Sequence, residues 1–216
     1  MASRIARIRL LDEAARLIST ILSPLLTPSY GMFMALSISP KVLDTMGSRI
    51  KLLLIIFGIT CVLPMATIAV LHNFKYIKDK RLLKREDRLI PYITGTIYYV
   101  IAVWYLAYTY EPRWLVMFAA GGALACLIST LVNLKWKISA HMAGMGGVLA
   151  LLWQLDAMDL EVISPKWMVF FILVAIGLCG VLGSARMLLK RHNLPQVLAG
   201  FLNGLVCVSL AMRLFG

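Results

Sequence analysis

Acidic side chains are scarce in this sequence of 216 residues, where 10 Asp and Glu stand against 22 Lys and Arg. With so few carboxylates and no cluster of them, the sequence offers no ligand set for magnesium, and we predict a protein without a metal or other cofactor. Cysteine is also rare, and its four occurrences form no CxxC pair and match no histidine at metal-ligand spacing: Cys61, Cys126, Cys179 and Cys207. All four lie in apolar runs, which excludes a disulfide framework and a zinc site and indicates small buried side chains.

Charged residues of both signs make up only 15% of the chain, whereas 61% of it is hydrophobic. That balance excludes an ordinary soluble domain. Several apolar runs reach the roughly 20 residues that an α-helix needs to cross a bilayer. The alternating pattern of a membrane β-barrel is absent. The sequence therefore predicts an all-α integral membrane protein.

A formal net charge of +12 is typical of nucleic-acid binders and of membrane proteins with basic loops. No segment here interleaves aromatic and basic residues in a soluble module that could read bases, so we exclude nucleic acid as a partner. The charge indicates instead loops that face the anionic headgroups of a bilayer.

The apolar runs predict a single domain, residues 17–216, built as a bundle of six or seven transmembrane helices. Six spans are expected at about residues 50–74, 90–110, 114–134, 138–155, 167–183 and 194–215. Pro64 is expected to kink the first of them.

The N-terminal part of the chain differs in character from these spans. Residues 1–16 alternate basic residues with Ile and Leu, which predicts an amphipathic helix at the membrane surface. Residues 17–37 are apolar but contain Pro24, Pro28 and Gly31. Two alternatives follow for this stretch: a kinked span, or a segment that dips into the membrane and returns.

Polar residues gather at three places between the expected spans. The first is the basic run of residues 75–91, the second is the ISAH sequence of residues 138–141, and the third is residues 184–200 with Arg186, His192 and Gln196. Two spans separate each cluster from the next, so an even number of crossings places all three on one face of the membrane. Polar groups at the end of a span are costly unless paired or used, which favours one composite site.

In this order the clusters resemble the type-2 phosphatidic acid phosphatase superfamily, the membrane relatives of the vanadium haloperoxidases. Its motifs read K-x6-R-P, P-S-G-H and S-R-x5-H-x3-D. Arg186 and His192 keep the third spacing, and the following VLAG is also family-like. The resemblance covers about residues 75–204.

The other two motifs match with substitutions. Ser139-Ala140-His141 follows the second, with Ile138 in place of Pro and Ala140 in place of Gly. In the first, Arg81 stands seven residues before Arg88 where Lys is usual, and Pro91 comes two residues late.

The resemblance implies a phosphatase that works through a phosphohistidine. By similarity His192 is the nucleophile, and His141 is the acid that protonates the leaving alkoxide. The cationic groups that would neutralise the phosphate are Arg81, Lys84, Arg88, Lys137 and Arg186. Ser139 and the amides around Ala140 can donate hydrogen bonds to phosphoryl oxygens.

Two departures bear on the chemistry. Gln196 stands where the family has an Asp, so a neutral carbonyl replaces a carboxylate as acceptor of the His192 ring N–H. It can fix the tautomer but gives less electrostatic stabilisation. The Ser before the third-motif Arg is Ala185, with Ser184 one place too early, so one hydroxyl donor is missing or shifted.

Each motif also has a purely structural interpretation, and for residues 184–200 it is a basic juxtamembrane loop that touches lipid headgroups. Arg81, Lys84 and Arg88 recur at helical spacing, as on a solvated helix that touches lipid headgroups. His141 can be a helix-start residue bonded to backbone.

The function predicted from the sequence is hydrolysis of a phosphate or pyrophosphate from a membrane lipid. Candidate substrates are phosphatidate, phosphatidylglycerophosphate, a related phospholipid phosphate or a polyprenyl phosphate. One alternative is a catalytically silent lipid-phosphate binder, suggested by Gln196. The other is a small transporter, suggested by the Pro- and Gly-interrupted spans, although polar residues collect at one interface rather than at the membrane midplane.

Charge asymmetry gives an expected orientation in a bacterial inner membrane. If residues 17–37 cross the membrane, the face with the motifs carries most of the 22 basic residues. Positive charge stays cytoplasmic, so we predict a site that opens to the cytoplasm. Without that crossing the two faces are nearly balanced, and many members of the resembled family face the other way.

Overall fold

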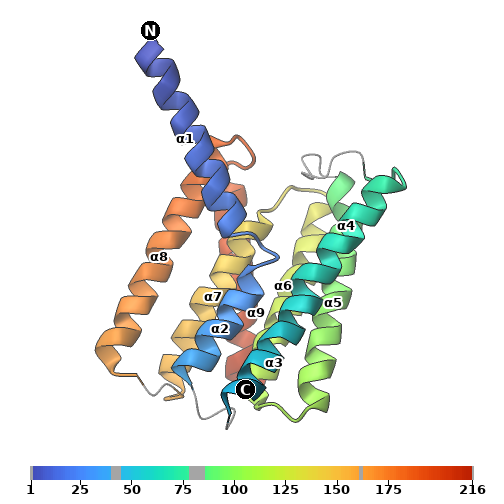
Figure 1. The fold of residues 1–216 in the computed structure, drawn as a ribbon, viewed down its shortest axis with the longest axis vertical. Helices are drawn as coiled ribbons and strands as arrows, with labels where there is room; N and C mark the ends of the chain where they lie inside the picture. The colour runs from blue at the N-terminus through green and yellow to red at the C-terminus, as the bar shows by residue number, and fades with distance from the viewer. Residues whose placement is uncertain (1, 40–44, 78–85, 161–162, 216) are drawn as a thin grey trace.

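The computed structural model describes residues 2–39, 45–77, 86–160 and 163–215, and within these ranges the chain is helical without any β-strand. Its elements are α1 (Ala2–Ile21), α2 (Thr27–Ile38), α3 (Met46–Phe57), the π-helical turn η2 (Gly58–Val62), α4 (Leu63–Asn73), the 3-10 turn η3 (Glu86–Arg88), α5 (Leu89–Tyr108), α6 (Arg113–Asn133), α7 (Ala140–Ala157), α8 (Pro165–Leu188) and α9 (Leu194–Phe215). Figure 1 shows them as a bundle from which α1 projects at one end.

Among the described residues, five helical stretches are long and apolar enough to cross a bilayer: Met46–Asn73, Leu89–Tyr108, Arg113–Asn133, Pro165–Leu188 and Leu194–Leu214. The prediction of an all-α membrane protein is confirmed at this level. Large apolar side chains also cover the outside of the bundle, as at Leu173 (61% exposed) and Trp104 (63% exposed). Surfaces of this kind need a lipid environment.

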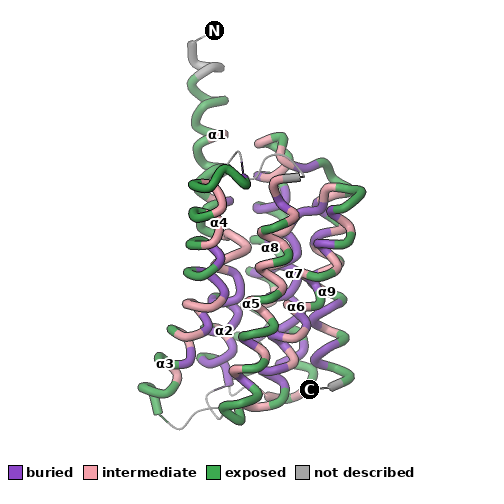
Figure 2. Tube along the Cα trace, turned by 90° about the vertical axis from the view of Figure 1, so that its right-hand side faces the viewer, coloured by how far each residue is buried: buried purple, intermediate pink, exposed green. Residues whose placement is uncertain are grey.

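The sixth expected span, α7, has 18 residues and lies in the middle of the bundle. It contains polar residues and small glycines, so its composition is less apolar than that of the five others. It does not need a lipid-facing surface, because α2, α6, α8 and α9 surround it. Ala150, Leu151, Leu152 and Leu155 are fully buried on it. Figure 2 shows the buried residues along these inner elements and the exposed ones on the outer helices.

Glycines bring the backbones of α7 and α9 into direct contact. A Cβ on Gly204 would overlap the carbonyl oxygen of Ala143, and one on Gly146 would overlap that of Phe201. Small residues let membrane helices approach closely in this way. On the other side of α9, the Asn203 amide donates to the carbonyl oxygen of Ala125 at 2.8 Å, which ties α9 to α6.

Residues 17–37 cross the bundle rather than return. Helix α1 ends at Ile21, the chain breaks around Pro24, and α2 continues to Ile38. Figure 1 shows that α1 reaches into the bundle from one end and that α2 continues from there to the opposite end, where α3 starts. Near Pro64, where a kink is predicted, the helix is interrupted by η2, a π-helical turn just before that proline.

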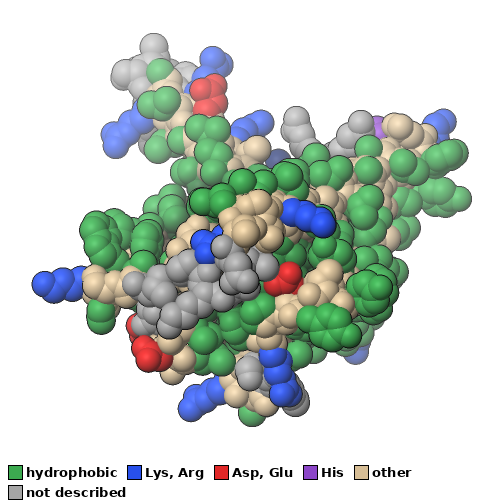
Figure 3. Space-filling model, turned by 60° about the horizontal axis from the view of Figure 1, so that its bottom comes forward, with side chains coloured by type: hydrophobic (Ala, Val, Ile, Leu, Met, Phe, Trp, Pro, Cys, Tyr) green, Lys and Arg blue, Asp and Glu red, His purple; other side chains and the backbone are tan. Residues whose placement is uncertain are grey.

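The connections alternate between the two ends of the bundle. Figure 1 places the N-terminus, the α6–α7 link and the α8–α9 turn at one end, together with the end of α4 and the start of α5. We call this the motif end. The opposite end holds the C-terminus and the α2–α3, α5–α6 and α7–α8 links, and Figure 3 shows acidic and basic side chains interspersed there within a hydrophobic surround. The described residues of the three polar clusters therefore share one end, as the even number of crossings predicts.

Candidate active site

The α8–α9 turn positions His192 through its backbone. Lys190 adopts a positive φ of 53°, which turns the chain at the end of α8. The Arg186 carbonyl then accepts the N–H of Arg191 at 3.1 Å and that of His192 at 3.4 Å. The Asn193 side chain accepts the Gln196 N–H at 3.1 Å and caps the start of α9. His192 is held between these two helix ends and is only 6% exposed.

Gln196 fixes the tautomer of His192. Its Oε1 lies 3.2 Å from Nδ1 of His192 and also accepts the backbone N–H of Asn193 at 3.4 Å. The backbone N–H of Asn193 can only donate, so the side-chain atom of Gln196 that faces it is the amide oxygen. Because that oxygen can only accept, Nδ1 of His192 must carry the proton. Nε2 then keeps a lone pair. The contact that the resemblance implies for these two residues is therefore present.

The electrostatic environment of His192 keeps the imidazole neutral. Burial, together with the nearby charges of Arg88, Arg186 and Lys137, lowers its pKa to about 3, although the bond to Gln196 acts in the opposite direction. A neutral imidazole with a free Nε2 lone pair is the nucleophilic form of histidine.

Arg88 lies at the start of α5 and is only 8% exposed. Its Nη1 donates to the carbonyl oxygen of Ile138 at 3.5 Å, and the Tyr92 hydroxyl donates to the same oxygen at 3.4 Å. Tyr92 also hydrogen-bonds Arg88. These bonds join the first polar cluster to the second. Burial lowers the pKa of Arg88 and, with the neighbouring arginines, that of Lys137.

The α6–α7 link positions His141 at the start of α7. Ser139 caps this helix by accepting the Met142 N–H, and its own N–H donates to the Gln196 carbonyl at 3.3 Å. Ser139 is fully buried, and Gly200 lets α9 approach its carbonyl closely. The starts of α7 and α9 are therefore bonded to each other.

His141 contacts α1. Its Nε2 lies 3.1 Å from the carbonyl oxygen of Ser19. A carbonyl only accepts, so Nε2 carries the proton and Nδ1 is left for another partner. The backbone-bonded alternative for this histidine is thus present, and it leaves one ring nitrogen available for chemistry.

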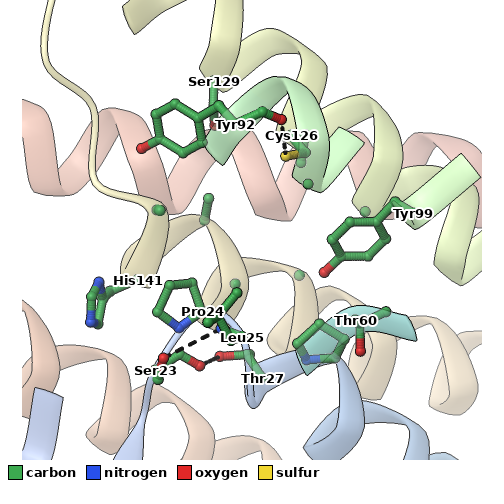
Figure 4. Close-up of a pocket in the computed structure, with 18 of the residues that line it drawn as sticks. Ser23, Pro24, Leu25, Thr27, Thr60, Tyr92, Tyr99, Cys126, Ser129 and His141 are labelled. Carbon is green, nitrogen blue, oxygen red and sulfur yellow. Dashed lines mark hydrogen bonds between the residues drawn. The ribbon is translucent and has the colours of Figure 1, made fainter. Parts of the chain in front are cut away.

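One cavity of about 350 Å³ joins these groups. At the motif end it is lined by Arg88, Tyr92, His141, Arg186 and His192, which we call the mouth. Inside the bundle it continues between α2, η2, α4, α5, α6 and α7, and we call this part the chamber. Figure 4 shows the surrounding side chains, with His141 on one side and Tyr92 and Tyr99 on the other.

The mouth contains an unmet hydrogen-bond donor. Nε of Arg186 is buried and has no partner among the residues that the structure describes. A buried donor without an acceptor is destabilising, and an anionic oxygen would relieve the cost.

The structure brings most of the expected site residues together. Ala140 lines the cavity with the mouth residues, and Lys137 is near enough to influence the pKa of His192. Gln196 and Ser139 support the site without lining the cavity. Arg81 and Lys84 lie outside the described residues. Within those residues, no three His, Cys, Asp or Glu side chains gather where a metal could bind, and metal independence stays a prediction.

Two contributors have no motif in the sequence. Tyr92 follows Arg88 by four residues, a helical spacing that could have indicated their contact. Ser19 acts through its backbone and is 122 residues from His141, so no local pattern could have found it. Comparisons of this chain with protein-family models, curated proteins and solved structures gave no match. The family resemblance therefore rests on the three motifs.

Proposed function

We propose that this protein is a membrane lipid phosphatase that transfers a phosphoryl group through His192. The observation that carries the proposal is the shared mouth: a neutral, tautomerically fixed His192 lines the same cavity as Arg88 and Arg186. Arginine pairs favourably with phosphate oxygens, and neutralising their charge lets an imidazole approach phosphorus.

In the first step, Nε2 of His192 forms a bond to phosphorus as the bond from phosphorus to the ester oxygen breaks. Burial lowers the pKa of His141 to about 3, so the phosphate monoanion has to bring in the proton that His141 takes at Nδ1 and gives to the departing alkoxide. The phosphorylated His192 ring is positively charged, and the Gln196 carbonyl accepts its Nδ1–H.

In the second step, water attacks phosphorus and the bond to Nε2 breaks. His141 now takes the proton from that water and is ready for another cycle. Phosphate leaves, and the neutral His192 ring returns. No step uses a metal.

The decisive experiment measures phosphate release by purified protein from a panel of phosphatidate, phosphatidylglycerophosphate, a polyprenyl phosphate, a polyprenyl diphosphate and an aryl phosphate. We expect release from at least one lipid, unchanged by a chelator. His72→Ala is the matched control for histidine loss, because His72 lies at the end of α4 and does not line the cavity. Lack of release from every substrate would refute the phosphatase.

The second candidate is a binder of lipid phosphates without turnover. It is favoured by the neutral Gln196 beside His192, which offers less stabilisation of a phosphohistidine than a carboxylate. Saturable binding of phosphatidate without phosphate release would favour it. A transporter is less consistent with the site, because the described cavity lining carries its charged side chains only at the mouth.

We further propose that the motif end faces the cytoplasm of a bacterial inner membrane. Basic loops stay cytoplasmic, and residues 17–37 cross the bundle, which keeps the basic N-terminal helix on the motif end. Leu194→Cys at the motif end and Ser164→Cys at the other end, both exposed positions, report the two faces. In intact cells an impermeant thiol reagent should label only Ser164→Cys above the wild-type background. Labelling of Leu194→Cys alone would reverse the orientation.

A further inference from the structure

The cavity continues well beyond the charged mouth. Its inner lining includes Thr60 of η2, Pro64 and Ile68 of α4, Phe118 and Ala125 of α6, and Val148 of α7. The mouth and chamber form one continuous space whose volume of about 350 Å³ is within the range of small-molecule pockets, about 300–1,000 Å³. A ligand whose phosphate sits at the mouth therefore has room to extend into the bundle.

Most hydroxyl and thiol groups of the chamber have protein partners, and the Tyr99 hydroxyl is the exception for which the described residues show none. Thr60 donates to the Ile56 carbonyl at 2.8 Å, and the Cys126 thiol donates to the Tyr92 carbonyl at 3.5 Å. Other such bonds are Thr27 to the Ser23 carbonyl at 2.8 Å, Tyr98 with Thr67 at 2.6 Å, and Asn203 to Ser129 at 2.9 Å. A polar ligand would find few free partners there and would lose its own bonds to water. The chamber is thus suited to hydrocarbon.

Local features of the surrounding helices make room for the chamber. The chain breaks between α1 and α2 around Pro24, and η2 interrupts the helix that faces it. Gly95, Gly144 and Gly147 also line the space, and a Cβ added to them would contact Cys126, Thr27 and Val208 respectively. π-Helical turns are frequent at functional sites, and an unfilled apolar void in a packed bundle is destabilising. In a bilayer the available filler is a hydrocarbon chain.

We infer that the chamber takes one hydrocarbon chain of the phosphate ester and discriminates between substrates by the length of that chain. This inference rests on the proposed phosphatase and specifies its substrate class: a phosphate whose chain enters the protein instead of remaining in the surrounding lipid. Binding energy from the chain then contributes to holding the phosphate against Arg88 and Arg186.

The test compares kcat/KM for n-alkyl phosphates of increasing length in wild type and in two variants of α4. Ile68→Trp reduces the space in the chamber, whereas Val70→Trp adds the same side chain at an exposed position (51%) on the same helix. We expect kcat/KM of wild type to rise with chain length. The ratio of long-chain to short-chain kcat/KM should fall at least tenfold in Ile68→Trp and stay within twofold of wild type in Val70→Trp. A ratio that is unchanged in Ile68→Trp, or no dependence on chain length in wild type, overturns the inference.

A second measurement separates this inference from the phosphatase itself. A long-chain alkyl phosphate with a photoreactive group at the end of the chain is cross-linked to His192→Ala, which cannot turn it over. Labelled peptides from α4, α6 and α7 that disappear in Ile68→Trp support the chamber even if no phosphatase activity is found. Labelling confined to lipid-facing positions overturns the chamber even if phosphate release is robust.

Discussion

The α8–α9 turn and the α6–α7 link each place a histidine at the same mouth, but they hold it in different ways. His192 is bonded through Nδ1 to a side chain one helical turn away in its own segment. His141 is bonded through Nε2 to the backbone of α1, which is remote in sequence. The free nitrogen is therefore Nε2 in one ring and Nδ1 in the other.

This difference matches the two proposed roles. A nucleophile benefits from a single fixed lone pair, which the Gln196 bond provides at Nε2 of His192. An acid has to gain and lose a proton, and the Nδ1 atom of His141 is available for that while its Nε2–H stays bonded to Ser19. Under the proposed mechanism, a motif residue, Gln196, orients the nucleophile, whereas the backbone of α1 orients the acid.

Replacing the nucleophile should have the largest effect. We expect His192→Ala to abolish phosphate release, because the proposed nucleophile is lost and the free Nδ1 of His141 is assigned to proton transfer. The variant should keep its far-UV circular dichroism and its elution volume, and His72→Ala should keep activity. Turnover in folded His192→Ala would remove the phosphohistidine mechanism.

Replacing the acid should be selective for the leaving group. General acid catalysis contributes on the order of 10²- to 10⁴-fold, so His141→Ala should lose about that much kcat with a lipid phosphate. An aryl phosphate has a better leaving group and should lose much less. The measurement is the ratio of the two losses, and equal losses argue against the acid role.

Replacing the group that orients His192 should have a smaller effect. Gln196→Ala should cost about ten- to a hundredfold in kcat, because the ring loses its tautomeric bias but keeps Nε2. Gln196→Asp should be at least as active as the parent, since a carboxylate stabilises the charged phosphohistidine, although its side chain is one methylene shorter. Full activity of Gln196→Ala would show that the bond between the two side chains has no role in turnover.

The smallest expected effect is that of pH on the protonation of the His192 ring, which is measured by ¹⁵N NMR of labelled histidine and not by activity. Because burial lowers the pKa of His192 to about 3, its ring should stay neutral from pH 7.5 to pH 5, with the proton on Nδ1. The unfolded chain binds this proton near pH 6.5, so the contribution of His192 to stability is full above that pH and declines as the pH falls toward 3. The His192→Ala spectrum assigns the signal. A midpoint near 6.5 would contradict the buried, neutral ring.

The sequence allowed some of this site to be predicted. The resemblance implies the contact between His192 and Gln196, because Gln196 stands where the family has the Asp that holds its histidine. Counting apolar spans predicts the common end of the three clusters. The first inference uses a motif and the second uses chain topology.

The remaining parts of the site depend on tertiary packing. The bond from His141 to Ser19 requires α1 to pack against α8 so that its end reaches the start of α7, and no residue pattern near either partner encodes that packing. The inward position of Ser139 follows from the close approach of α9 at Gly200. The chamber lies where several helices are interrupted or carry small residues. An apolar sequence does not by itself show that these positions meet.

The glycine contacts between α7 and α9 have a mechanical consequence. Backbones that touch without intervening side chains, as at Gly204 and Ala143, leave little freedom to slide, so the two helices should behave as one rigid body. If the cavity widens to admit a substrate, we expect the motion to come from α1, α2 and η2 instead. Hydrogen–deuterium exchange tests this: amides of η2 and α2 should exchange faster than those of α7 and α9, and the reverse order would place the moving wall in the glycine-packed pair.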